Sequence, residues 1–222
     1  GLPRLTAERL SLMCACDALN VIYGEKRTYF KFPNKNSLIS MYKNPRGCIL
    51  NRLTLIIRGI KMPELVNPTD SLNSFQHALS NSLIRLSPCV VHPEMKVLMD
   101  DADGTPRITY AFVQGDIVKG VAIYVPADPY EGKPCFGVGY AVADKFKRQG
   151  IATKLLKASI EEMQYGFRNS CNEFYVEAIV GVDNQASNKL ASEVLSATPK
   201  PGKDSHSGKP INQYMKLFST TK

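Results

Sequence analysis

The order of apolar segments between residues 108 and 218 constrains the fold more than any other feature of the chain. Two segments with strand-like composition, 108–113 and 118–125, flank Gln114-Gly115-Asp116, which is typical of a tight hairpin. The segments that follow predict a strand at 136–142, a helix from residue 150, a strand at 174–182, a helix at 184–195 and a strand at 213–218. A hairpin followed by strand, helix, strand, helix and strand predicts an α/β (mixed α+β) fold, in which helices flank a central mixed β-sheet.

The remaining segments give weaker patterns. Residues 5–23 have a helix-like composition, and residues 53–57 are expected to form a strand. A helix is expected to start at a cap, Asp70 or Ser71, and to be closed by Pro88, because apolar residues recur between them at helical spacing. These residues are Leu72, Phe75, Leu79, Leu83 and Leu86. The other expectations are a short strand at 95–99, a turn at 100–104 and a Pro-, Gly- and Ser-rich loop at 198–210.

Positive charge is concentrated at one end of the chain. The 222 residues include 28 Lys and Arg against 20 Asp and Glu, a formal net charge of +8. The first 60 residues hold ten of the basic and three of the acidic side chains, which leaves +7 there and +1 on the other 162 residues. This asymmetry predicts an attached function or an anionic partner at the N-terminal end of the chain.

Composition excludes several classes of protein. A 44% hydrophobic and 22% charged content is ordinary for a soluble globular protein and excludes disordered and fibrous chains. The most apolar stretch, 53–60, is short and interrupted by Arg58, so no membrane span is expected. The six Cys form no Cys-x-x-Cys units and the three His are scattered, so no metal site is expected. No signal peptide is evident, and a reduced, cytoplasmic location is expected.

The most informative segment runs from residue 138 to residue 156. It predicts a strand that passes through a short basic turn, with Lys145, Lys147 and Arg148, directly into a helix. A helix N-terminus presents unpaired N–H groups and a partial positive charge, which together favour an anion. Gly150 lets the backbone approach a bulky anion, and the small Ala152 leaves the first helical turn uncrowded. The combination favours a pyrophosphate, and an ordinary turn with solvated lysines is the alternative.

This segment resembles the acetyl-coenzyme A-binding motif of the GNAT superfamily of acyltransferases, which is Gln/Arg-x-x-Gly-x-Gly/Ala between a strand and a helix. The residues in register with the family pattern are Val142, Phe146, Gly150, Ile151 and Ala152. Two residues depart from it, since Lys147 stands at the Gln/Arg position and Asp144 where Pro is usual. Residues 184–190 are similar to the family's Asn-x-x-Ala/Ser-x-x-Leu motif, and residues 55–58 with the later Asp70 resemble its first strand and helix. The resemblance covers about residues 50–222, which implies a GNAT-like domain at 50–222 preceded by a basic N-terminal extension at 1–49.

The resemblance implies that acetyl-coenzyme A (acetyl-CoA) is the co-substrate and that no metal is needed. The backbone of Tyr140, Ala141 and Val142 would pair with the pantetheine amides like an added strand. The turn and the first helical turn would hold the pyrophosphate, and two residues of the later motif would lie beside the pantetheine arm. These residues are Lys147, Arg148, Gln149, Gly150, Ile151, Ala152 and Thr153 for the pyrophosphate, and Asn184 and Ser187 for the arm.

The resemblance also implies direct attack of an amine on the thioester, which needs a base and a proton donor for the leaving thiolate. Glu177 is the expected base, because a carboxylate within an apolar strand must be paired, hydrated at a cleft or perturbed. A half-exposed strand on which Glu177 simply faces water is the alternative. Many family members carry a Tyr seven residues after the motif's Asn, but that position is Ala191 here. Tyr140 and Tyr214 are substitutes by location, and water is a third donor.

The sequence therefore predicts an N-acetyltransferase that acts on a primary amine, carried by a small molecule or a macromolecule. One alternative is acetylation of an aminoacyl-tRNA or another nucleic-acid-associated amine. Another is a non-catalytic module that binds acyl-coenzyme A or nucleic acid. The stretch 26–58 interleaves aromatic and basic residues as single-stranded nucleic acid binding requires, although a solvated extension is the favoured interpretation. No membrane partner is expected, and a homodimer is left open.

Overall fold

A computed structural model describes residues 68–102, 105–205 and 207–221, together with the backbone of four short strands before residue 50. These strands form two antiparallel pairs, β1 (Tyr29–Lys31) with β2 (Leu38–Ser40) and β3 (Tyr42–Asn44) with β4 (Gly47–Ile49). The helix expected at 5–23, the strand expected at 53–57 and the domain boundary expected after residue 49 lie outside the described residues.

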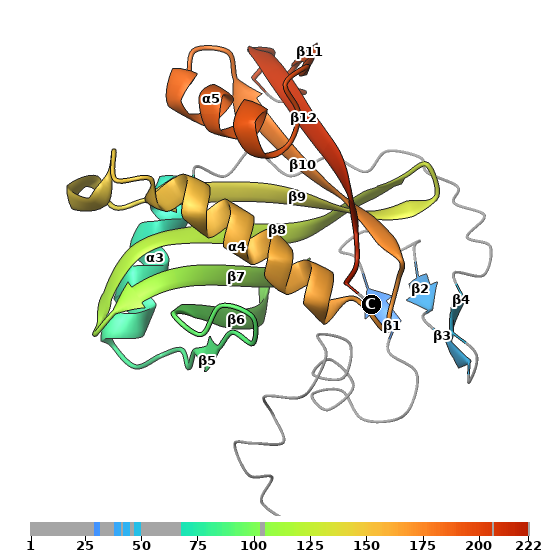
Figure 1. Cartoon of the computed structure of the whole chain (residues 1–222), viewed down its shortest axis with the longest axis horizontal. Helices are drawn as coiled ribbons and strands as arrows, with labels where there is room; N and C mark the ends of the chain where they lie inside the picture. Colours follow the sequence, from blue (N-terminus) through green and yellow to red (C-terminus); the bar gives the residue numbers. More distant parts are fainter. Residues whose placement is uncertain are drawn as a thin grey trace, which may run out of the picture.

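Among the described residues, the main sheet contains eight strands in the order β11-β12-β10-β9-β8-β7-β6-β5 (Figure 1). Neighbouring strands are antiparallel except β9 and β10, which run parallel, so the predicted mixed sheet is confirmed. The strands are β5 (Ser87–Pro88), β6 (Met95–Ala102), β7 (Thr105–Gln114), β8 (Ile117–Tyr130), β9 (Lys133–Val142), β10 (Glu173–Gly181), β11 (Lys200–Lys203) and β12 (Pro210–Ser219).

Two helices cover opposite faces of this sheet, as Figure 1 shows. The helix α3 (Pro68–Ser80) packs against β8 and β9 on one face, and α4 (Ile151–Gly166) crosses β7, β8 and β9 on the other. The shorter α5 (Gln185–Val194) follows β10 and packs on β10 and β12. The predicted helices after residues 150 and 184 are therefore confirmed. In the part of the chain that the structure describes, no helix has the length and apolar character needed to cross a bilayer.

Each face of the sheet has its own apolar core. On the α4 face, Leu155 of the helix and Phe174 of β10 are fully buried in one cluster. On the α3 face, Leu72 and Phe75 of the helix pack with the fully buried Val121 of β8. Burial of these side chains supplies the main driving force that holds the helices on the sheet.

The two cores also decide which way β9 and β10 turn their side chains. Val138 of β9 belongs to the α4 cluster, whereas Ala141 of the same strand packs into the α3 cluster. Val176 and Ala178 of β10 belong to the α4 cluster as well. Because successive side chains of a strand alternate between faces, Glu177 projects from the α3 face.

The helix predicted after residue 70 begins and ends earlier than its apolar pattern indicated. It starts at Pro68, ahead of the predicted cap, and it ends at Ser80. Ser82 has a φ of 55°, a left-handed conformation that ends a helix. Leu83, which is 71% exposed, and Leu86 therefore lie outside the helix, although their spacing continues the pattern.

Several strands are longer than predicted, and one lies where a loop was expected. β6 continues through residues 100–102, which were expected to turn, because the Asp100 carboxylate accepts two N–H groups of Arg107 on β7, at 2.8 and 2.5 Å. β8 and β9 extend beyond their predicted ends into a long hairpin, and a register shift after Ala127 accommodates the proline-containing stretch. β11 lies within the predicted loop at 198–210. The tight hairpin at Gly115 and Asp116 is confirmed, with Gly115 at a φ of 58°.

Candidate active site

β9 and β10 separate shortly after they meet, and the gap between them is the centre of the candidate site. Their parallel pairing runs from Tyr175 with Cys135 to Glu177 with Gly137. In the described chain, β9 then continues to Val142 paired only with β8, while β10 pairs only with β12 and leads to α5 (Figure 1). Backbone N–H and C=O groups on this edge of β9 therefore face the gap, where an extended ligand can pair with them as an added strand.

The turn after β9 leads directly into the N-terminus of α4. A single 3-10 turn (Asp144–Phe146) is followed by two left-handed residues, Arg148 at a φ of 60° and Gly150 at 73°. The left-handed conformation favours glycine at position 150, and a Cβ there would meet no described atom within 4 Å. The N–H groups of the first turn of α4, which begins at Ile151, have no partner within the helix. The turn therefore offers helix N–H groups beside open space.

Positive side chains lie along this turn. The Nζ atoms of Lys119 on β8 and of Lys145 lie over the Phe146 ring, 5.5 and 5.1 Å from its centroid. Lys147 binds the Asp144 carboxylate at 2.6 Å, and this hydrogen bond lowers the pKa of that carboxyl group. The lysines and the helix N-terminus together favour a multiply charged anion.

Tyr140 crosses the gap from β9 to α5. Its hydroxyl group donates to the backbone oxygen of Ser187 at 3.1 Å. Asn184 caps α5, because its side-chain oxygen accepts the N–H of Ser187 at 3.1 Å. Burial raises the pKa of Tyr140 to about 12, so its hydroxyl group keeps its proton at neutral pH.

Tyr214 is buried in a separate network that joins β12 to α5. Its hydroxyl group donates to Oδ1 of Asn188 at 2.7 Å, and the same oxygen accepts from Nδ2 of Asn212 at 2.8 Å. Nδ2 of Asn188 donates to the backbone oxygens of Gly181 and Asn184, both at 2.8 Å. The Asn188 amide thus uses both of its N–H groups and both lone pairs of its oxygen, and it fixes α5 against the sheet.

Glu177 lies on the other face of the sheet, at the last residue pair before β9 and β10 separate. Its side chain is half-buried, and Oε1 accepts a hydrogen bond of 2.5 Å from Nε2 of Gln213. Gln213 lies on β12, opposite Ile179 in the antiparallel register, and so reaches Glu177 diagonally. The hydrogen bond fixes the orientation of the carboxylate at the edge of the gap.

Two neighbouring groups are held in their neutral forms. Cys135 is buried, and burial, followed by the negative charge of Glu177, raises the pKa of its thiol to about 11. A thiol that stays protonated is a poor nucleophile. Tyr175 donates to the Glu131 carboxylate at 2.7 Å, at the tip of the β8–β9 hairpin.

The predicted site residues therefore lie around one gap, in three groups. The expected coenzyme residues occupy the free edge of β9, the turn into α4 and the start of α5, and the expected base is on the opposite face. The edge holds Tyr140, Ala141 and Val142; the turn holds Lys147, Arg148, Gln149 and Gly150; the first turn of α4 holds Ile151, Ala152 and Thr153; Asn184 caps α5 and Ser187 lies within it. The two candidate acids, Tyr140 and Tyr214, both belong to the α4 side of the sheet.

Sequence reasoning missed Gln213 and Asn188. Gln213 binds Glu177 across 36 positions of sequence, and Asn188 binds Tyr214 across 26. Neither residue belongs to a local motif that carries its role. The antiparallel register of β10 with β12 brings Gln213 to Glu177. That register is read from the strand pairing and not from a local motif.

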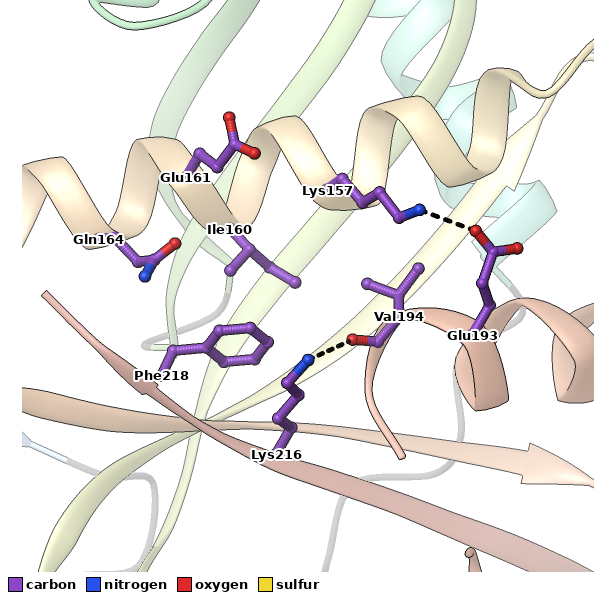
Figure 2. Close-up of a pocket in the computed structure, with 8 residues that line it drawn as sticks. All are labelled: Lys157, Ile160, Glu161, Gln164, Glu193, Val194, Lys216 and Phe218. Atoms are coloured by element: carbon purple, nitrogen blue, oxygen red, sulfur yellow. Dashed lines mark hydrogen bonds and ion pairs between the residues drawn. The ribbon is translucent and has the colours of Figure 1, made fainter. Parts of the chain in front are cut away.

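A different hollow lies between α4, α5 and β12 (Figure 2). Lys157 pairs with Glu193 across it at 2.8 Å, and Lys216 donates to the backbone oxygen of Val194 at 3.3 Å. No predicted site residue lines this hollow, so it is described separately from the candidate site. Within the described residues, no group of three or more His, Cys, Asp or Glu side chains could hold a metal ion.

Comparison with solved structures finds acetyltransferases among the similar chains. A GNAT-family acetyltransferase from Streptococcus pneumoniae is 15% identical, with 51% of this chain and 67% of that chain covered and a TM-score of 0.39. A ribosomal L7/L12 α-N-protein acetyltransferase in complex with coenzyme A is 22% identical, with 52% and 64% covered and a TM-score of 0.41. The ribosomal-protein-S5-alanine acetyltransferase from Vibrio fischeri is 13% identical, with 51% and 61% covered and a TM-score of 0.40. This chain thus spans about two thirds of their length.

The sequence profile of a protein family decides the assignment. A search of curated proteins finds no significant match to the chain. Residues 77–195 match the profile of the Acetyltransferase (GNAT) family, and this match includes more than half of the chain. It spans most of the main sheet, the turn after β9, Glu177 and the start of α5. The chain belongs to the GNAT family of acetyltransferases.

Proposed function

We propose that the protein transfers an acetyl group from acetyl-CoA to a primary amine by direct attack in a ternary complex. The observation that carries this proposal is the gap between β9 and β10, with a free strand edge and a basic helix N-terminus on one side and Glu177 at its narrow end. Membership in an acetyltransferase family supports the choice of donor.

In this proposal the coenzyme lies along the free edge of β9. The backbone of Tyr140, Ala141 and Val142 pairs with the pantetheine amides, and the diphosphate lies at the N–H groups that begin α4. The open space beside Gly150 supports this placement, because a Cβ there would meet no described atom within 4 Å. Asn184 and Ser187 lie at the start of α5, on the other side of the gap.

Glu177 acts as the base in this proposal, directly or through water. The amine nitrogen attacks the thioester carbonyl carbon, the carbon–sulfur bond breaks, and the proton lost from nitrogen passes to the carboxylate. The hydrogen bond from Gln213 supports this role, because it holds one carboxylate oxygen and leaves the other to receive a proton.

The coenzyme thiolate is stabilised by a hydrogen-bond donor or takes its proton from water. Tyr140 is the better-placed of the two tyrosines, because its half-buried side chain bridges the gap and keeps its proton at neutral pH. Tyr214 is 3% exposed, and its hydroxyl group already binds the saturated Asn188 amide. Ala191, at the position where many relatives carry the acid, is fully buried.

The acceptor is proposed to be the amine of a macromolecule, a protein N-terminus or an aminoacyl-tRNA included. Two of the similar structures are acetyltransferases of ribosomal proteins by name. The +7 charge of residues 1–60 supports an anionic partner or acceptor surface. If that partner is nucleic acid, the affinity of the full chain for single-stranded RNA should fall steeply and log-linearly with salt. Neutralising Lys31, Lys35 and Lys43 with Gln should reduce that slope.

Turnover of acetyl-CoA with a mixed panel of amines tests the proposal. The panel includes peptides, aminoacyl-tRNA and small amines, with free coenzyme A measured as a thiol and products identified by mass spectrometry. Acetylated amine, formed in step with free thiol, is the expected result. Coenzyme binding without transfer to any amine would favour the non-catalytic module, and absence of coenzyme binding would refute the proposal.

A further inference from the structure

Gly137 is a glycine in the interior of a central strand, where glycine weakens the strand. Its φ is not in the left-handed range that requires glycine, unlike that of Gly115 or Gly150. A Cβ at position 137 would have Val125 Cγ2 at 3.7 Å and the Val125 backbone oxygen at 4.0 Å, which are ordinary van der Waals distances among the described residues. Neither the backbone conformation nor packing against the described residues explains the glycine.

Two other strand glycines, Gly120 and Gly139, have a packing reason that Gly137 lacks among the described residues. A Cβ at Gly120 would lie 3.0 Å from the backbone oxygen of Ala141. A Cβ at Gly139, two residues along β9, would lie 3.3 Å from Cγ of Pro68 at the start of α3. Close approach of another part of the protein therefore accounts for these two positions. Close approach of a ligand is another reason for a glycine within a strand, and among the described residues only Val125, besides the chain neighbours, lies within 4 Å of a Cβ at Gly137.

The position of Gly137 indicates which ligand would approach it. Gly137 is the register partner of Glu177 in the last pair before β9 and β10 separate. It projects from the α3 face, as Glu177 does, because Phe136 and Val138 on either side pack into the α4 cluster. The space over Gly137 is thus beside the Glu177 carboxylate and on the face opposite the turn into α4 that the coenzyme is proposed to occupy.

We infer that Gly137 is a specificity-determining residue, whose missing side chain leaves room for the substituent on the amine-bearing carbon of the acceptor. This inference rests on the proposed function, since it takes Glu177 as the group that meets the acceptor nitrogen. The substrate class that follows is a primary amine on a substituted carbon, such as the α-amine of a peptide. An amine at the end of an unbranched chain would not need the space over Gly137. A methyl group at position 137 narrows this space without disturbing the strand.

Two conjugates test the inference, and neither requires the natural acceptor to be identified. Carboxymethyl-coenzyme A is joined through an amide to glycinamide in one and to L-valinamide in the other, so that only the substituent on the amine-bearing carbon differs. Calorimetry measures the affinity of each conjugate, and of coenzyme A alone, for the full chain and for Gly137→Ala. We expect Gly137→Ala to weaken the valinamide conjugate about tenfold or more, as overpacking a filled site does. The glycinamide conjugate should weaken less than about threefold, and coenzyme A less than about twofold.

Gly166→Ala is the matched control, because that position ends α4 with no described atom within 4 Å of a Cβ. It should leave all three affinities unchanged. Gly137→Ser, with a larger side chain, should discriminate between the conjugates more strongly than Gly137→Ala, and thermal melting checks that both variants fold. Equal weakening of the two conjugates would indicate that Gly137 makes room for the acyl group instead of the acceptor substituent. Unchanged affinities of both conjugates would show that Gly137 has no role in specificity. Either result overturns the inference. If wild-type chain does not bind coenzyme A, the proposed function itself fails, and the inference fails with it.

Discussion

The turn from β9 into α4 and the strand pair β10–β12 form the two halves of the candidate site in different ways. The turn uses consecutive residues, and its main contribution is backbone, with left-handed residues at 148 and 150 that precede the N–H groups of α4. The strand pair uses side chains from separate strands, and Glu177 meets Gln213 across 36 positions of sequence. One half depends on local conformation and the other on register.

This difference predicts which functions can be separated. A change in the turn should alter coenzyme affinity while the acceptor side keeps its geometry. A change in the strand pair should alter turnover while coenzyme affinity stays the same. Each of the following substitutions tests that separation, and a variant that changes both properties equally would argue against it.

Glu177→Gln should have the largest effect, a loss of turnover on the order of 10²-fold at neutral pH, because the amide cannot accept the proton from the amine. Coenzyme affinity, measured by calorimetry, should stay within about twofold of wild type, since Glu177 is on the face opposite the turn into α4. The loss should shrink as pH rises, because more of the acceptor amine is then deprotonated before it binds. A pH-independent loss, or turnover equal to wild type, would remove Glu177 from the base role.

Glu162→Gln is the control for that experiment. Glu162 is a buried carboxylate on α4 that accepts the backbone N–H groups of Val90, Val91 and His92, at 3.2, 2.7 and 2.6 Å. Its amide variant loses one charged acceptor and should lower the free energy of unfolding by about 2 kcal/mol, measured by urea denaturation. Turnover of the folded variant should stay close to wild type, so the two carboxylates should show opposite responses.

Gly150→Asp should reduce coenzyme affinity about 30-fold, because the aspartate carboxylate repels the diphosphate proposed to bind at the N-terminus of α4. This loss is equivalent to about 2 kcal/mol of binding free energy. The control is Gly115→Asp in the β7–β8 turn, where φ is also left-handed and a Cβ is also in open space. Both variants should lose similar stability in thermal melts, because both force an aspartate into the left-handed region. Equal coenzyme affinity in a folded Gly150→Asp protein would show that the diphosphate binds elsewhere.

The same difference explains which parts of the molecule the sequence predicts. The strand, basic turn and helix around Gly150 are consecutive, so spacing and composition are enough to predict them. The predicted end of α3 was wrong, because the helical spacing of apolar residues continues to Leu83 and Leu86. The helix itself ends at Ser80, before the left-handed Ser82. Gln213 could not be predicted as a partner of Glu177, because a shift of one residue in the β10–β12 register would place it on the other face.

Gln213→Leu should reduce turnover about tenfold, the equivalent of about 1.5 kcal/mol for a hydrogen bond to a charged group, and should leave coenzyme affinity unchanged. Leucine has a similar size but cannot donate to Oε1 of Glu177, so the carboxylate loses its fixed orientation. Gln164→Leu removes a comparable bond, from Nε2 to the backbone oxygen of Ser219 at 2.6 Å, away from the site. That control should keep wild-type turnover; a loss as large as that of Gln213→Leu would indicate a general effect on β12.

Tyr140→Phe and Tyr214→Phe should have the smallest effects, and they distinguish the two candidate acids. Each variant loses one hydrogen bond, which is worth about 1 kcal/mol or about fivefold. For Tyr140→Phe we expect this loss in turnover, because the hydroxyl group bridges β9 and α5 at the gap. The loss should be constant between pH 7 and 9, since the pKa of Tyr140 is raised to about 12 and its proton is present throughout. For Tyr214→Phe the loss should be in unfolding free energy alone, because Asn188 still binds Asn212. If Tyr214→Phe lowers turnover and Tyr140→Phe does not, the donor to the thiolate is on β12, and the strand pair supplies the acid as well as the base.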